Sequence, residues 1–305
     1  MPYFFLTMTV LFWAGNFVTA RGIHDDFPPL TMSFMRWGLA LLIILPFVLP
    51  RIRRKWPVIR ANLPILLLLS LLSVVCFNSF IYLGVQTTQA TNATLMQSAI
   101  PIIILLMTSV FLGETVMRRQ WLGVFISLAG VIMLVAQGDL QTLLTFTFNK
   151  GDLWILAGVL SWAAYSVMLR LKPTELDGFT FFGLTVIVGV IVLFPFMLWE
   201  FLLGARPVWN VQTVSVIVYM AICPSILSYI FWNRGVAELG AAKAGLFIHL
   251  LPPFGLILSV IFLNEAVEAF HFIGFGLIFS GIYLAIITGR QHNEKKSPAS
   301  LNAAE

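Results

Sequence analysis

Long apolar stretches separated by short polar ones set the pattern of this chain. A helix that crosses the hydrocarbon core of a bilayer needs about 20 mostly apolar residues, and ten stretches of roughly that length follow one another. We expect membrane helices at residues 3–20, 30–49, 63–83, 91–112, 121–136, 153–169, 179–203, 211–232, 244–263 and 270–288. Pro195 and Pro224 interrupt the seventh and eighth, so these two are the least regular. The connections are too short to hold a separate soluble domain.

The second half of the chain repeats the first. A constant offset of 151 residues aligns Gly84/Gly235, Ala90/Ala241, Ala93/Ala244, Pro101/Pro252, Glu114/Glu265, Gly123/Gly274 and Gly130/Gly281. An offset of 149 pairs Trp13 with Trp162 and Arg21 with Arg170. Each half crosses the membrane five times, so the second half starts on the opposite side of the membrane from the first. The two halves are therefore inverted relative to each other. We divide the chain into repeats at 1–138 and 139–289 and a disordered cytoplasmic tail at 290–305; such duplication is typical of secondary transporters.

Composition and charge agree with this pattern. Hydrophobic residues make up 59% of the chain and charged residues 10%, which excludes a soluble globular protein. With the N-terminus inside, fourteen of the eighteen Lys and Arg fall on the inner side, three (Arg21, Lys150 and Arg206) fall outside, and Arg36 lies within a span. This asymmetry predicts a multi-pass protein of the bacterial inner (cytoplasmic) membrane with both termini in the cytoplasm. The net charge of +5 belongs to the inner loops and does not indicate nucleic-acid binding.

Polar residues inside apolar spans are the first candidates for a binding site, because each costs free energy in hydrocarbon. Asn78 and Tyr82 stand four residues apart on one helix face, and the repeat offset matches them to Tyr229 and Asn233. The same residue types in swapped order could form a two-sided polar wall around a substrate. The alternative is that they only form hydrogen bonds between helices.

Three further groups of residues complete the expected substrate site. In the first and sixth spans, Trp13 and Asn16 lie opposite Trp162 and Tyr165, whose rings could stack on a substrate or simply pack. In the fourth and ninth spans the candidates are Gln97, Ser98, Phe247 and His249. A lone histidine cannot assemble a metal site. His249 could bind substrate, carry a proton, or serve as a neutral hydrogen-bonding group between helices.

Prolines recur at the same repeat position beside these candidates. Pro101, Pro252 and Pro253 each remove an amide donor and free a carbonyl four residues earlier. We expect a break in both helices, which could act as a hinge or as a static kink.

Charged residues near the membrane have several interpretations. Arg36 could bind a substrate carboxylate, pair with Asp25 or Asp26, or anchor the helix at the interface. Glu114 and Glu265 are expected to cap helices or close tight turns. No acidic residue lies in the middle of a span.

Three segments resemble a known family: FWAGNFVTARGI at 12–23, FMRW at 34–37, and ATNATLMQSAIPIIILLMTSVFLGE at 90–114. They are similar to the EamA branch of the drug/metabolite transporter superfamily. The resemblance implies ten helices in two five-helix repeats, export of amino acids and related metabolites, and a cavity lined by spans one, three, four, six, eight and nine. It also places Arg36 in a span that does not mainly line the cavity, which favours a structural role. The small multidrug members carry a proton-coupled carboxylate in their first helix. Here Ala14 or Asn16 occupies that region, which argues against cation antiport by that route.

Together these observations predict an all-α transporter that exports amino acids or related small metabolites by alternating access through a midplane cavity. Because we expect no strong charge in that cavity, it suits zwitterionic or neutral solutes. The alternatives are a channel or facilitator for small neutral solutes and a multidrug or nucleobase exporter. We expect no catalytic residues, cofactor or metal, because an enzyme would need convergent acid, base or metal groups. The sequence leaves open whether transport is coupled to protons. It also leaves open whether the protein is a monomer or a homo-oligomer.

Overall fold

A computed structural model describes residues 1–23, 25–88, 90–113, 115–139, 149–263 and 268–287. These residues form helices and connections, and no strand occurs among them. Ten helices are long and apolar enough to cross a membrane, which confirms the predicted all-α membrane fold. Glu114, Glu265 and the expected tail lie outside the described residues.

The first half of the chain contains α1 to α8. Its elements are α1 (Pro2–Gly22), α2 (Pro29–Arg54), α3 (Trp56–Ala61), α4 (Leu63–Ser70), η1 (Leu71–Cys76), α5 (Phe77–Gly84), α6 (Ala90–Gln97), α7 (Ile100–Leu112) and α8 (Arg118–Val135). Segment η1 is a π-helical stretch that joins α4 to α5 in one span.

The second half repeats this order. Its elements are α10 (Lys150–Met168), η2 (Leu169–Leu171), α11 (Gly178–Leu202), α12 (Val211–Met220), η3 (Ala221–Leu227), α13 (Ser228–Leu239), α14 (Ala241–Leu246), η4 (Phe247–Leu250), α15 (Leu251–Leu263) and α16 (Ala269–Ile287). Pro195 is tolerated inside α11, which runs unbroken to Leu202. Pro224 lies in η3, a second π-helical segment at the repeat position of η1.

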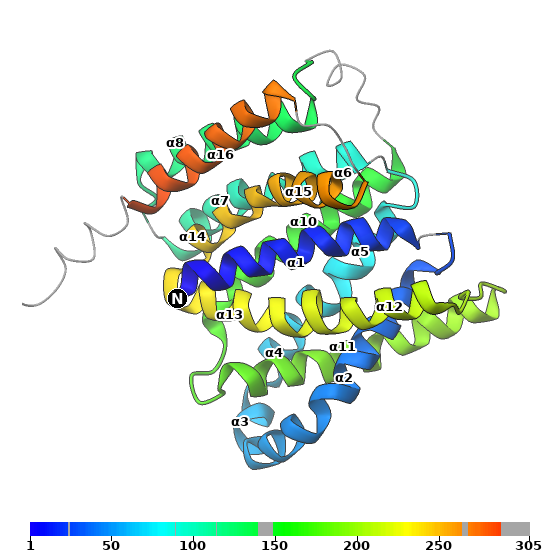
Figure 1. The fold of residues 1–305 in the computed structure, drawn as a ribbon. Coiled ribbons are helices and arrows are strands. Elements are labelled where there is room, and N and C mark those ends of the chain that lie inside the picture. Colours follow the sequence, from blue (N-terminus) through cyan, green and yellow to red (C-terminus); the bar gives the residue numbers. More distant parts are fainter. Residues whose placement is uncertain (24, 89, 114, 140–148, 264–267, 288–305) are drawn as a thin grey trace, which may run out of the picture.

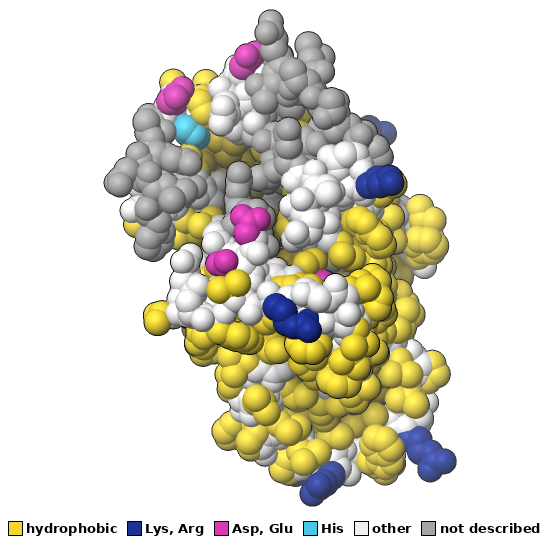
Figure 2. Space-filling view, turned by 90° about the vertical axis from the view of Figure 1, so that its right-hand side faces the viewer, with side chains coloured by type: hydrophobic (Ala, Val, Ile, Leu, Met, Phe, Trp, Pro, Cys, Tyr) yellow, Lys and Arg dark blue, Asp and Glu magenta, His cyan; other side chains and the backbone are white. Residues whose placement is uncertain are grey.

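The spans stack in layers, with α8 and α16 paired at one edge and α2 packed on α11 at the other (Figure 1). Between these edges α1 packs against α13, and α10 packs against α5. Each contact has a counterpart in the other repeat, as an inverted pair requires. Hydrophobic side chains cover much of the face in Figure 2, with Lys and Arg at isolated points.

Residues at equivalent repeat positions meet each other along the line between the halves. The rings of Trp13 and Trp162 lie 5.0 Å apart, and Asn78 donates a hydrogen bond to Tyr229 (3.0 Å). A residue that contacts its own counterpart must lie on the pseudo-two-fold axis. These pairs therefore mark the axis in the centre of the molecule.

Glycines form a reciprocal pair of contacts between α8 and α16, in which each glycine of α8 meets the repeat counterpart of the other. A Cβ added at Gly130 would lie 2.6 Å from the Gly274 carbonyl oxygen, and one added at Gly123 would lie 2.5 Å from that of Gly281. The two helices approach with backbone against backbone, as small residues allow in membranes.

We predict that Gly130→Ala lowers the melting temperature of the purified protein in detergent. The new methyl group meets backbone atoms that cannot move aside cheaply, and such overpacking costs about 1–3 kcal/mol. Gly276→Ala on α16 is the matched control, because an added Cβ there meets nothing within 4 Å. Equal melting temperatures for the two variants would contradict this account of the α8–α16 contact.

Candidate functional site

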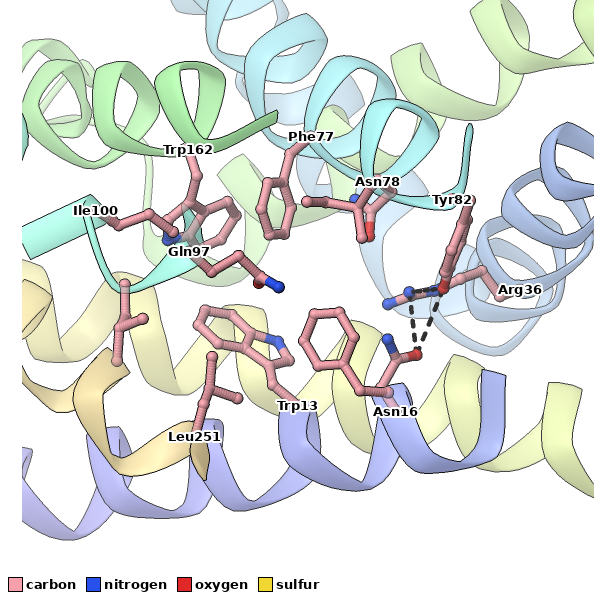
Figure 3. Close-up of a pocket in the computed structure, with 13 residues that line it drawn as sticks. Trp13, Asn16, Arg36, Phe77, Asn78, Tyr82, Gln97, Ile100, Trp162 and Leu251 are labelled. Carbon is pink, nitrogen blue, oxygen red and sulfur yellow. Dashed lines mark hydrogen bonds between the residues drawn. The ribbon is translucent and has the colours of Figure 1, made fainter. Parts of the chain in front are cut away.

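A small central cavity lies between the two repeats (Figure 3). Its volume is about 30 Å³, enough for little more than a water molecule. Its walls come from both repeats: Trp13, Asn16, Phe17, Arg36, Phe77, Asn78, Ile81, Tyr82, Gln97, Ile100, Trp162, Ile248 and Leu251. Spans one, two, three, four, six and nine thus contribute. Span two was not expected, and span eight is absent from this lining.

Arg36 forms the most polar corner of the cavity. Its side chain is 1% exposed, and Nε donates to Ser225 Oγ (2.8 Å). Its Nη1 donates to the Tyr82 hydroxyl (2.5 Å) and, more distantly, to Asn16 Oδ1 (3.4 Å), as the dashed lines in Figure 3 mark. The guanidinium carbon also lies 5.1 Å from the centre of the Trp37 ring. All of these partners are neutral.

This geometry corrects two expectations. The cavity does contain a strong buried charge, and Arg36 is part of its wall rather than only an anchor at the membrane interface. The bonds and ring contacts given above for Arg36 go to residues of α1, α2, α5 and η3. The signal was present in the sequence, because Arg36 is the only Lys or Arg that the predicted topology places within a span. An intramembrane charge is by default a functional candidate.

The second repeat forms the same bond with exchanged residue types. Tyr82 donates to Asn16 Oδ1 (3.4 Å) in the first repeat, and Tyr165 donates to Asn233 Oδ1 (2.6 Å) in the second. The offsets match Asn16 to Tyr165 and Tyr82 to Asn233. Thr185 stands at the position equivalent to Arg36, so the second pair has no equivalent charge.

The π-helical segments supply carbonyls that accept hydrogen bonds from side chains, and in each segment one donor belongs to the opposite repeat. The Ser73 carbonyl in η1 accepts from Asn78 Nδ2 (3.0 Å) and from the Tyr229 hydroxyl (2.7 Å). The equivalent carbonyl of Pro224 in η3 accepts from Trp13 Nε1 (3.3 Å). Of these side chains, Trp13 and Asn78 line the central cavity and Tyr229 lies behind it.

Trp162 is the hub of an aromatic cluster beside the cavity. It is fully buried, and its ring lies 4.6–5.5 Å from the rings of Trp13, Phe77, Tyr165, Tyr229 and Trp232. Its Nε1 has no hydrogen-bond partner among the described residues. Both tryptophans pack in this cluster and both line the cavity, and the stacking of their rings on a substrate stays a prediction.

Of the four candidates in the fourth and ninth spans, Gln97 lines the central cavity and the other three do not. The Gln97 amide points into the cavity, as Figure 3 shows. Ser98 Oγ donates to the carbonyl of Leu95 in its own helix, and Phe247 stacks on Tyr3 with ring centres 6.2 Å apart. Ile248 and Leu251 line the cavity in place of Phe247 and His249.

His249 is fully buried between two helices and held at both ring nitrogens. Nε2 lies 2.9 Å from the Ser98 carbonyl oxygen, and Nδ1 lies 2.6 Å from Ser127 Oγ. A carbonyl only accepts, so Nε2 carries a proton. Because a charged ring is costly at a fully buried position, the ring is neutral and Nδ1 accepts from the hydroxyl. This arrangement matches the interhelical alternative considered for His249.

Both proline-bearing spans are interrupted beside the cavity. Helix α6 ends at Gln97 and α7 begins at Ile100, one residue before Pro101. In the ninth span, η4 is a short 3₁₀ helix that ends at Leu250, two residues before Pro252. The breaks lie where the prolines predict them, and their action as moving hinges stays a prediction.

A second and larger pocket opens on the side of the molecule that holds the N-terminus. We call it the N-side pocket; its volume is about 740 Å³, and α7, α10, η2, α11, α13 and α14 line it together with residues 172–174. Asn233 borders this pocket and not the central cavity. Arg170, Lys172 and Arg234 also line it. Burial lowers the pKa of Lys172 from its ordinary value, and the carboxylates of Asp177 and Glu175 oppose this shift.

Comparison with known proteins agrees with this architecture. The model of the EamA-like transporter family matches residues 1–136 and 149–287. An uncharacterized transporter of Archaeoglobus fulgidus is 30% identical over 94% of this chain and 97% of its own length. The uncharacterized transporter YyaM of Bacillus subtilis is 26% identical over 97% and 98%.

Two further similarities are more distant. A probable terminal-alkyne amino-acid exporter of Streptantibioticus cattleyicolor is 24% identical over 92% of this chain and 91% of its own length. A protein of known crystal structure shares the fold with a TM-score of 0.76, at 18% identity, over 95% of this chain and 98% of its own.

We predict that Ser127→Ala lowers the melting temperature, because the buried Nδ1 of His249 loses its hydrogen-bond donor. The expected cost is about 1 kcal/mol. Ser280→Ala on α16 is the control, since that hydroxyl is exposed and donates only within its own helix. A melting curve for Ser127→Ala that overlays the wild type would contradict the assigned bond.

Proposed function

The chain belongs to the EamA-like transporter family, and from this premise we propose that it exports amino acids or related small carboxylates by alternating access. Membership makes it a multi-pass membrane transporter and not an enzyme. The proposal concerns the solute, the direction and the mechanism.

The buried guanidinium of Arg36 carries the proposal. A charge taken out of water costs several kcal/mol unless it is paired, and the described residues around Arg36 offer only neutral oxygens and an aromatic face. A solute carboxylate that enters the cavity would supply the missing negative charge and could bind in a bidentate manner. Asn16, Asn78 and Gln97 would hydrogen-bond its polar groups, and Trp13 and Trp162 would cover its apolar part.

The size of the cavities supports a carrier over a channel. The central cavity of about 30 Å³ is too small for an amino acid, and the Arg36–Tyr82–Asn16 bonds tie α1, α2 and α5 together on one side of it. The larger pocket lies on the side of the N-terminus. A closed site with one wider approach is typical of one state in alternating access, whereas a channel needs a continuous polar path.

The charge pattern and one relative support the proposed direction and location. We place the N-side pocket on the cytoplasmic side of a bacterial inner membrane, because most Lys and Arg fall there. The relative from Streptantibioticus cattleyicolor, a probable amino-acid exporter, supports outward transport of a similar class of solute.

Flux into proteoliposomes of purified protein tests the proposal. Labelled amino acids and their decarboxylated amines are compared, with and without a pH gradient and against empty vesicles. Saturable flux of the acids alone supports the proposal, and dependence on the gradient adds proton coupling. Flux of amines or nucleobases in place of acids would remove the preferred solute and favour the multidrug or nucleobase alternative.

We predict that Arg36→Gln lowers kcat/KM for a transported carboxylate at least about thirtyfold, because a desolvated charge pair is lost. Arg36→Lys should restore only part of the rate, since a lysine cannot reproduce the guanidinium fork. Flux is measured per amount of folded protein.

Thermal melting separates this role from a structural one. If Arg36 serves the solute, Arg36→Gln keeps the wild-type melting temperature, because removing an uncompensated charge offsets the lost bonds. Arg119→Gln at the exposed start of α8 is the control and should keep full flux. A large drop in melting temperature with normal flux per folded molecule would instead assign Arg36 to structure.

A further inference from the structure

The N-side pocket contains three buried polar atoms that no protein group satisfies. They are Thr108 Oγ1 on α7, Ser166 Oγ on α10 and Asn233 Nδ2 on α13. The residues are 3%, 0% and 8% exposed, respectively. Buried hydroxyls and amides are nearly always hydrogen-bonded, so three unpaired ones from three helices that border one pocket favour a partner inside it.

The unpaired atoms share one chemistry, since each can donate. Asn233 Oδ1 already accepts from Tyr165 (2.6 Å), which leaves the Nδ2 protons as the unused part of the amide. Hydroxyls in a helix usually donate to a carbonyl of their own helix, as Ser161 does to Ala157 (2.8 Å). Thr108 and Ser166 form no such bond in the described part of the chain, so their protons are unused. Both oxygens are covered by neighbouring atoms, so an acceptor in the pocket reaches them only after a side-chain rotation.

The charged residues that line the pocket are all basic: Arg170, Lys172 and Arg234, with no Asp or Glu in the described lining. Arg234 Nε donates to Glu238 Oε1 (2.8 Å), and Lys172 donates to the backbone carbonyls of Pro173 and Leu176. These bonds hold Lys172 and Arg234 in place. Glu238 offsets the charge of Arg234, and Asp177 and Glu175 act on Lys172, so the positive field that attracts anions is weaker than the three cations alone would give.

The N-side pocket also adjoins the central cavity. Ser166 lies four residues after Trp162 on α10, which places the two side chains on one helix face a single turn apart. Trp162 lines the central cavity and Ser166 lines the N-side pocket. The ring of Tyr165, on the same stretch of α10, lies 5.2 Å from that of Trp162.

We propose that the N-side pocket is a second binding site, for the carboxylate of a small organic acid. Asn233, Ser166 and Thr108 hold the carboxylate, and Val167, Phe181 and Ile230 cover the apolar part. The proposal rests on the proposed function in one respect, because this site would load the central cavity with the solute that Arg36 receives. Its neutral donors bind the anion more weakly than the guanidinium does.

The test uses the full chain in detergent with Ala237→Cys as reporter, after Cys76→Ala and Cys223→Ala remove the native thiols. Ala237 is an exposed residue of the pocket lining and contributes no polar side chain. Modification by 2-sulfonatoethyl methanethiosulfonate is timed with phenylacetate or phenylacetamide present. The two compounds have the same shape and differ in charge. Phenylacetate should slow modification at a concentration at least about fivefold lower than phenylacetamide.

Variants of the unpaired donors identify where the acid binds. Thr108→Val and Ser166→Ala should each raise the half-protecting concentration of phenylacetate about tenfold, the effect of one lost bond to a charged acceptor. Ser161→Ala on α10 is the matched control and should leave it unchanged, since its hydroxyl donates within its own helix. Thr108→Val keeps the side-chain shape, so a folding defect is not expected.

Arg36→Gln separates this inference from the proposed function. Protection that survives Arg36→Gln, while flux is lost, supports a second site. Equal protection by acid and amide, no protection, or protection that disappears with Arg36→Gln would each overturn the N-side site. None of these outcomes contradicts the role of Arg36 in the proposed function, which the flux of Arg36→Gln tests separately.

Discussion

Hydrocarbon offers no hydrogen-bond partners, and this constraint shapes the centre of the molecule. A regular helix satisfies its own backbone, but η1, η3 and the break before Pro101 do not. Their carbonyls are paired by side chains instead: Ser73 with Tyr229, Pro224 with Trp13, and Ser98 with His249. In each case the donor belongs to the opposite repeat. The irregular backbone therefore serves to join the two halves beside the cavity.

The two halves share one backbone plan but differ in polarity. In the first half, Asn16 and Tyr82 accept hydrogen bonds from the buried guanidinium of Arg36. In the second half, Tyr165 and Asn233 bond only to each other among the described residues at this place, because Thr185 stands where the first half has the arginine. The first pair belongs to a cluster held by charge-assisted bonds, and the second depends on neutral bonds alone. The barrier on the arginine side is thus expected to open only when something takes over the bonds of Arg36. A solute that bears a carboxylate meets that condition.

The spans, the repeat and most of the aromatic and amide lining could be predicted from sequence, because they depend on apolar length and on a fixed offset. The direction in which individual side chains point could not be predicted from sequence. A π-helical turn adds one residue and rotates the rest of the helix about its axis, and the 3₁₀ turn of η4 directs Ile248 and Leu251, rather than Phe247 and His249, to the cavity. The unpaired state of Thr108 and Ser166 was equally hidden, since it depends on distances between separate helices.

The bond between Asn78 and Tyr229 has a consequence for how such a molecule could arise. A dimer of two identical five-helix chains would place two copies of the same residue on its axis, so a tyrosine would face a tyrosine. A fused chain can change one copy without the other and set an amide donor against a phenol there. Joining the halves in one polypeptide therefore freed the axis to become asymmetric.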